Sequence, residues 1–130
     1  MANYTTKLSM FESATNTAGT VTATTTSAGF DVSARNKFSI QVIASGITSG
    51  NGVFTVDVSN DNGATWTAYN RIVSNVTNTN AQNDTCVASV TLSSNSSAMM
   101  FFPVGDHFQM IRVTCTRTTD GTYSAFLSAF

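Results

Sequence analysis

The amino-acid sequence predicts an all-β protein, a single antiparallel β-sandwich of about seven or eight strands with jelly-roll or immunoglobulin-like topology. Short runs in which apolar and polar residues alternate recur along the 130 residues, and glycine-containing turns separate them. No run shows the apolar spacing of an amphipathic helix. A chain of this length buries roughly two thirds of its unfolded surface, which is enough for one core without staples.

The first segment, residues 1–29, carries a Thr-, Ala- and Ser-rich stretch with few large apolar side chains. Residues from Val21 to Thr25 have the alternation of a strand, but their small side chains give that strand little to bury. We therefore expect an N-terminal arm or a weak edge strand here. The β-sandwich domain is expected to span residues 30–130.

Strands become well defined after Phe30. Residues 37–44 alternate strictly, and glycines in the segment from Ser45 to Gly52 end this strand. The alternation places four apolar side chains on one face of the sheet: Phe38, Ile40, Val42 and Ala44.

Residues 53–69 predict a β-hairpin. Phe54, Val56 and Val58 share one face of its first strand, and the run Asn-Asp-Asn-Gly supplies the residues of a turn. The second strand begins near Trp66.

In the second half, residues 74–84 are too polar to form core and are expected to be a connection long enough to reach another subunit. Residues 85–92 alternate as a strand. The run Met-Met-Phe-Phe-Pro at residues 99–103 predicts either a strand end covered on both faces or a contact patch.

A second hairpin is expected from residues 108–117 and 123–130, with Asp120-Gly121 at its turn. Phe108 and Met110 fall in the opposite parity to the apolar residues that follow them. This predicts a bulge near Met110 or a strand covered on both faces.

Charge and composition limit the classes of partner. Only 10% of residues are charged, the net charge is −1, and the six Lys and Arg residues form no basic run. Direct nucleic-acid binding is therefore not expected. No apolar run reaches the length of a membrane span, and the N-terminus lacks the apolar core of a secretory signal, so we expect no membrane partner and synthesis in a cytoplasm. A near-neutral surface favours assembly into a larger particle.

Candidate catalytic and metal-binding residues are few, so we expect no enzymatic activity and no cofactor. The one histidine, His107, lies in a Gly-Asp-His loop that favours a turn or cap role. Cys86 and Cys115 belong to no metal-binding pattern and are expected either as two buried free thiols or as one disulfide. The carboxylates of Asp57 and Asp61 begin a calcium-loop pattern that the following residues do not complete.

The segment from Ser59 to Trp66 resembles the Asp box, a Ser-x-Asp-x-Gly-x-x-Trp motif on β-hairpins of sialidases and other β proteins. In that family the motif is structural. The resemblance implies that Asp61 bonds the turn backbone, that Gly63 takes the strained conformation and that Trp66 packs under the hairpin. It supports a hairpin and gives no support for glycosidase activity.

Trp66 and Tyr69 have two alternative interpretations. Their rings either pack into the core or form an aromatic platform for stacking sugars, as in a carbohydrate-binding module. An exposed Trp66 ring would favour the second.

From residue 28 onward, the runs Gly-Phe-Asp-Val-Ser-Ala, Phe-Thr-Val-Asp-Val-Ser-Asn-Asp-Asn-Gly-Ala-Thr-Trp and Phe-Gln-Met-Ile-Arg-Val-Thr-Cys-Thr give the chain a wider pattern. This pattern resembles the small β-sandwich virion proteins of tailed bacteriophages, including head decoration, auxiliary capsid and tail accessory proteins. The resemblance implies a non-enzymatic subunit in the virion and, among such subunits, favours a head decoration or auxiliary capsid protein. Its partners would be copies of itself, the major capsid protein or other virion proteins.

Apolar residues in the second half exceed what one small core needs, which favours contacts between subunits in a homo-oligomer. The candidate interface residues are Met99, Met100, Phe101, Phe102 and Phe130.

Overall fold

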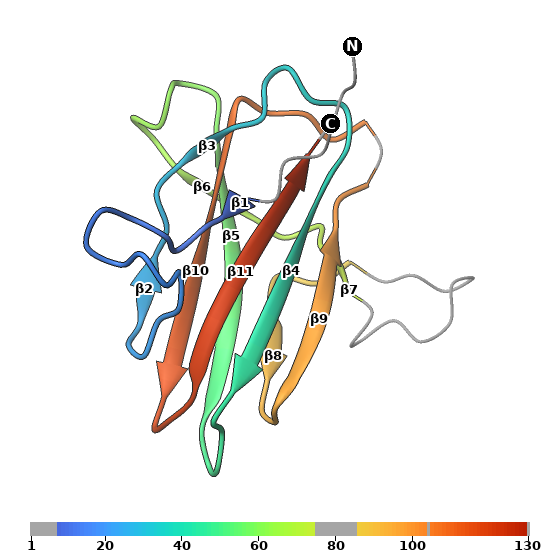
Figure 1. Cartoon of the computed structure of the whole chain (residues 1–130). Coiled ribbons are helices and arrows are strands. Elements are labelled where there is room, and N and C mark those ends of the chain that lie inside the picture. The colour runs from blue at the N-terminus through green and yellow to red at the C-terminus, as the bar shows by residue number, and fades with distance from the viewer. Residues whose placement is uncertain (1–7, 75–85, 104, 130) are drawn as a thin grey trace.

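A computed structural model of the chain describes residues 8–74, 86–103 and 105–129 and arranges eleven strands in two packed sheets (Figure 1). All strand pairs are antiparallel, and the described residues contain no helix. The predicted all-β sandwich is confirmed. The strand number exceeds the prediction because several edge strands are only two or three residues long.

The first sheet has the order β1-β11-β4-β9-β7, with strands Leu8–Ser9, Thr122–Ala129, Phe38–Ser45, Ser96–Phe101 and Val73–Ser74. The second sheet has the order β2-β10-β5-β6, with strands Thr25–Thr26, Met110–Thr118, Asn51–Ser59 and Thr67–Tyr69. Two further strands join this sheet: β3 (Phe30–Asp31) pairs with β10, and β8 (Val90–Leu92) pairs with β5.

The core lies between the sheets and is built from the inward-facing side chains of the long strands. Burial alternates along β4 and β10, which is what a strand does when one face meets the core and the other meets solvent. The largest fully buried side chains come from both sheets and from the loops that flank them: Tyr123, Phe54, Met10, Ile40, Ile72, Met100 and Ile111.

The first predicted hairpin is present. β5 and β6 pair antiparallel on either side of the Asn-Asp-Asn-Gly turn, with Val56 opposite Tyr69 and Val58 opposite Thr67. This turn therefore joins neighbours within one sheet.

The second predicted hairpin is wrong in its pairing. The turn around Asp120 and Gly121 is present, but β10 pairs with β5 in one sheet, whereas β11 pairs with β4 in the other. The turn therefore carries the chain across the sandwich. Local turn chemistry predicts a reversal of direction but does not specify which strand the returning chain will pair with.

Tyr123 occupies the corner where this turn crosses between the sheets. Its side chain is fully buried, and its hydroxyl donates a 3.0 Å hydrogen bond to the carbonyl of Asp120. A Cβ atom at Gly52 would lie 2.5 Å from the Tyr123 ring, so only glycine leaves room for the ring there.

The Asp120 side chain joins this turn to the β4–β5 connection. Its carboxylate accepts hydrogen bonds from the backbone N–H groups of Thr48, Ser49 and Gly50, the shortest being 2.9 Å from Gly50. The β4–β5 and β10–β11 connections, two of the crossings between the sheets, are therefore hydrogen-bonded to each other at the lower end of the molecule in Figure 1.

Residues 8–29 pack against the two sheets. β1 pairs with β11 and β2 pairs with β10, while Met10, Phe11 and Val21 are buried in the core.

Two expectations about strand limits need correction. β10 pairs with β5 residue by residue from Met110 to Thr118, so it has no bulge on the side of β5. Phe108 lies before the strand and packs into the core from the loop. The strand expected over residues 85–92 is limited to β8, and Cys86 is exposed ahead of it.

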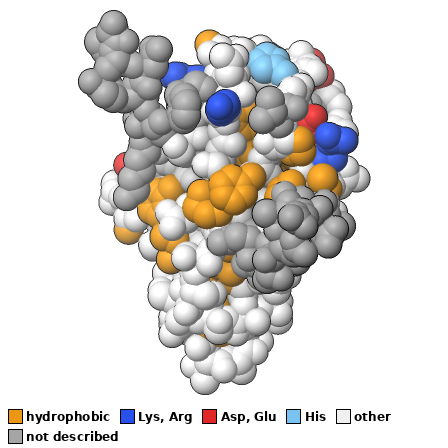
Figure 2. Space-filling view, turned by 90° about the vertical axis from the view of Figure 1, so that its right-hand side faces the viewer, with side chains coloured by type: hydrophobic (Ala, Val, Ile, Leu, Met, Phe, Trp, Pro, Cys, Tyr) orange, Lys and Arg blue, Asp and Glu red, His pale blue; other side chains and the backbone are white. Residues whose placement is uncertain are grey.

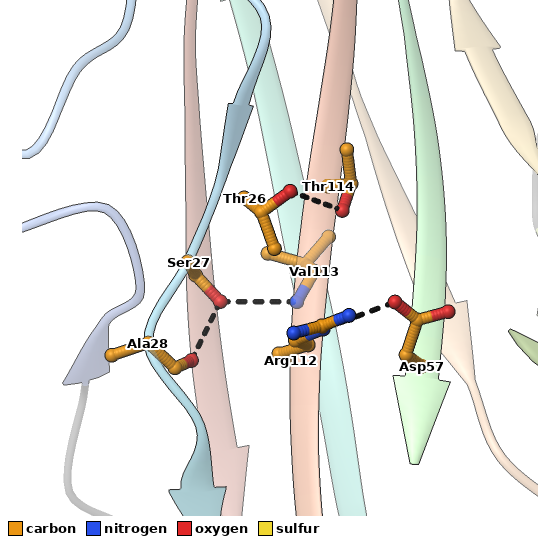
Figure 3. Close-up of polar contacts among 7 residues, drawn as sticks. All are labelled: Thr26, Ser27, Ala28, Asp57, Arg112, Val113 and Thr114. Carbon is orange, nitrogen blue, oxygen red and sulfur yellow. Dashed lines mark hydrogen bonds and ion pairs between the residues drawn. The ribbon is translucent and has the colours of Figure 1, made fainter. Parts of the chain in front are cut away.

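The serine at position 27 completes the edge of the second sheet between β2 and β3 (Figure 3). The backbone N–H of Ser27 donates to the carbonyl of Val113 at 2.8 Å, and its hydroxyl accepts the N–H of Val113 at 3.0 Å. The hydroxyl also donates to the carbonyl of Ala28 at 2.8 Å. One side chain thus satisfies a backbone donor that no neighbouring strand reaches.

We expect Ser27→Ala to destabilise the protein by about 1 to 3 kcal/mol, because the N–H of Val113 is buried and loses its acceptor. Chemical denaturation and amide hydrogen exchange at Val113 measure this effect. Thr26→Val is the matched control: its exposed hydroxyl bonds only the hydroxyl of Thr114, and we expect a change within about 0.5 kcal/mol. Equal losses of stability in Ser27→Ala and Thr26→Val would contradict this role for Ser27.

Candidate functional site

The described residues contain no group of three or more His, Cys, Asp and Glu side chains close enough to hold a metal ion. His107 contacts the carbonyl of Ser33 through Nε2 at 3.1 Å, in the loop region where the sequence placed it. None of the described residues belongs to a helix able to span a membrane.

The two cysteines are free thiols in different environments. Cys115 is buried in β10, and burial raises the pKa of its thiol to about 11. Cys86 is exposed, so the expectation of two buried thiols is wrong for this residue, and the alternative of a disulfide is not realised. Cys86 lies outside β8, which is why its strand-like alternation did not bury it.

The Asp-box-like turn is held by its own side chains. The Asp61 carboxylate accepts the hydroxyl of Ser59 at 2.7 Å and the backbone N–H of Thr65 at 2.8 Å. The Ser59 hydroxyl accepts the N–H of Gly63 at 2.9 Å, and Gly63 has a φ of +82°. These hydrogen bonds lower the pKa of Asp61, the bond from Thr65 being the largest cause.

Trp66 packs beside this turn on the outer face of the second sheet. The Arg112 guanidinium lies 4.4 Å from the centre of its ring, and Arg112 also pairs with Asp57 at 3.0 Å (Figure 3 shows this pair). The ring approaches Gly29 and Gly63 closely, since a Cβ at either position would lie 2.9 or 3.3 Å from it. Trp66 is thus half-buried under the hairpin.

Tyr69 does not share an exposed platform with Trp66. It is 8% exposed, its ring packs against Phe102 and Phe108, and its hydroxyl donates to Asp106 at 2.6 Å. The interpretation of Tyr69 as half of a glycan platform is therefore wrong. Its inward parity, opposite Val56, places it in the core.

The predicted apolar contact residues divide between the two faces of β9. Met100 is fully buried, so it cannot serve as a surface contact. Phe101 is 43% exposed, while Met99 and Phe102 are partly buried. Phe130, the last candidate, lies outside the described residues. β9 begins with Ser96 and Ser97, so only its last four residues carry apolar side chains, and their alternation is too short to stand out in the sequence.

The outer face of the first sheet is partly apolar. Register places Gln41 of β4 between Phe126 of β11 and Met99 of β9, and all three point away from the core. Ile43 and Phe101 lie on the same face, and both retain solvent exposure. The side chains named here are apolar, except for that of Gln41, and none of them is charged.

A hollow of about 290 Å³ lies at the end of β9. Its lining includes Lys37, Phe38, Phe101, Phe102, Pro103 and Asp106. The space-filling view in Figure 2 shows hydrophobic side chains exposed across the middle of this side of the molecule, with basic side chains above them. Sequence reasoning did not find this hollow because its lining comes from segments far apart in the chain.

Asp106, on one wall of the hollow, is tied to two partners. Its Oδ2 accepts the Tyr69 hydroxyl at 2.6 Å and the Arg71 Nε at 2.9 Å. The Tyr69 hydrogen bond is the main reason why the pKa of Asp106 lies below its ordinary value of 3.8, and Arg71 adds to the effect. Burial and the Asp106 charge raise the pKa of Tyr69.

We expect Asp106→Asn to be less stable than the wild type at neutral pH, and the difference to shrink in acid. A carboxylate whose pKa is lowered on folding stabilises the protein above its unfolded pKa, near 3.8, and loses this effect as pH falls through the lower folded value. Denaturation of both proteins between neutral pH and about pH 2 measures the difference. A difference that stays constant over this range would contradict the expectation.

Among protein families, no model matches this chain, and no curated protein is significantly similar to it in sequence. Among solved structures, the fold is similar to the crystal structure of the SPBc2 prophage-derived protein YomS, with a TM-score of 0.58 and 12% sequence identity. The similarity covers 97% of this chain and 93% of that chain. At this level of identity the similarity establishes a shared fold over nearly the whole of both chains.

Proposed function

We propose that this chain is a non-enzymatic structural protein of a bacteriophage virion, and within that class a head decoration or auxiliary capsid subunit. It would be made in the host cytoplasm, assemble with copies of itself and bind the particle through protein–protein contacts. The observation that carries the proposal is the outer face of the first sheet, where Phe101 is 43% exposed and Met99, Phe126 and Ile43 are partly exposed.

Two further observations support the proposal. The fold is shared with a prophage-derived protein along nearly the full length of both chains. Only 10% of the residues are charged and the net charge is −1, so an interface on the outer sheet faces would have few charges to desolvate.

The test is to purify particles of the phage or prophage that encodes the chain and to search them for this protein by mass spectrometry. Immunogold labelling of intact particles then distinguishes a head position from a tail position. We expect the protein in many copies on the head, and we expect particles that lack it to break at lower temperature. Absence from the particle would contradict the virion role, and labelling of the tail alone would contradict the head decoration role.

The oligomeric state has its own measurement, light scattering coupled to size-exclusion chromatography. We expect an assembly larger than a monomer, because apolar area buried between copies stabilises association by about 25 cal/mol per Å² before association costs. A strict monomer at all concentrations would contradict the homo-oligomer. Tight glycan binding that depends on Trp66 would instead favour the alternative function, that of a carbohydrate-binding module for glycan adhesion.

A further inference from the structure

The hollow at the end of β9 has an apolar floor that is already in place. The Phe38 ring contacts the rings of Phe102 and Phe108, with centroid distances of 4.9 and 5.2 Å, and Phe38 is itself 9% exposed. The Phe101 side chain remains 43% exposed at its margin. A side chain entering the hollow would therefore meet aromatic surface without first having to order the floor.

The charge at the margin of this hollow is positive. Lys37 lines it and is exposed, and the ion pairs among the described residues do not include Lys37. The acidic side chain on the wall, Asp106, is already bonded to Arg71 and Tyr69. A ligand would thus meet one unpaired cation beside an apolar floor.

We propose that this hollow binds an extended segment of another protein that carries an apolar side chain next to an Asp or Glu. The apolar side chain would lie on Phe38 and Phe101, and the carboxylate would face Lys37. The inference rests on the proposed function and deepens it, because it gives the chemistry of the partner that this surface accepts.

A second copy of this chain offers little of that chemistry among its described residues. The aspartates that the structure describes are engaged within their own subunit, in hydrogen bonds or ion pairs: Asp31, Asp57, Asp61, Asp106 and Asp120. Glu12 is exposed, but its neighbour Phe11 is 4% exposed and cannot accompany it into a hollow. Charge complementarity therefore favours a different protein as the occupant.

The experiment titrates the isotope-labelled full chain with capped peptides of the form Ser-X-Asp-Leu-Ser, where X is Phe, Tyr, Trp, Leu or Met, and follows backbone amides by NMR. The matched peptides carry Asn in place of Asp. We expect shifts at Phe38, Ser39, Phe102 and Ser128, and about fivefold tighter binding of the Asp peptide of a pair.

Two substitutions have matched controls. Lys37→Gln should abolish the preference for Asp over Asn, whereas Arg35→Gln, at an exposed cation outside the lining of the hollow, should preserve it. Phe101→Ala should weaken binding of both peptides about tenfold. Leu8→Ala, at an exposed apolar residue outside the lining of the hollow, should leave the binding of both peptides unchanged.

Any of three results would overturn the inference: no shift with any peptide at millimolar concentration, shifts confined to another surface, or equal affinity for the Asp and Asn peptides. Self-association that Lys37→Gln and Phe101→Ala both remove would place a second copy in the hollow and would overturn the choice of an outside partner. Peptide binding as expected, combined with absence of the chain from virions, would leave this inference standing while contradicting the proposed function.

Discussion

Gly50→Ala should be among the most destabilising single substitutions in this protein, with an expected loss of about 3 to 5 kcal/mol. A Cβ at Gly50 would overlap the carbonyl oxygen of Thr118 and lie 2.6 Å from the backbone nitrogen of Asp120. Both atoms belong to the backbone of the β10–β11 turn, so neither can move aside as a flexible side chain would. The β4–β5 and β10–β11 connections would have to move apart, and the hydrogen bond from Gly50 N–H to the Asp120 carboxylate would be lost.

Gly46→Ala is the control for this prediction, because it lies in the same connection but in open space. A Cβ at Gly46 meets no atom within 4 Å, and its only cost is the positive φ of 67°. We expect a loss of about 1 kcal/mol. Urea denaturation of the two variants separates the steric cost from the conformational one, and similar midpoints would show that the crossings do not meet as tightly as described.

Met100→Ala should destabilise the protein by roughly 2 to 5 kcal/mol, whereas Phe101→Ala should cost about 1 kcal/mol or less. Met100 is fully buried between the sheets, so truncation leaves a cavity that its neighbours fill only partly. Phe101, the next residue along β9, points away from the core and is 43% exposed.

Thermal and chemical denaturation of the two variants provide the measurement. Assays of self-association and of peptide binding on the same two variants test whether each substitution acts on contacts with partners. Phe101→Ala should alter assembly or peptide binding with little effect on folding, while Met100→Ala should act through folding. A reversal of these two effects would mean that β9 presents its other face to the core.

Much of the fold was predictable because it depends on local chemistry. Alternation located β4 and β5, since the side chains of a strand alternate between core and solvent with a period of two residues. The Asp120-Gly121 turn located β10 and β11 on either side of it. The run Asn-Asp-Asn-Gly located the turn between β5 and β6, where short polar side chains and a glycine with positive φ hold the backbone.

Other features were not predictable because they depend on which segments meet in space. β1 and β2 are two residues long, and a backbone pairing of that size has no periodicity to detect. The Asp120-Gly121 turn has the composition of a hairpin turn, yet Tyr123 and the glycines around it direct β11 into the opposite sheet. Cys86 alternates like a strand residue, but it is exposed and lies ahead of β8.

The sequence by itself determined the all-β class, the positions of the long strands and the hairpin turn at Ser59 to Trp66, because each depends on neighbours within a few residues. Only the tertiary structure decided which apolar residues remain at the surface. Met100 and Phe101 differ by the face of one strand, and the hollow beside them combines residues 36–39, 101–103, 106 and 128. Burial is a property of the packed sheets, and it is fixed only when distant segments close over one another.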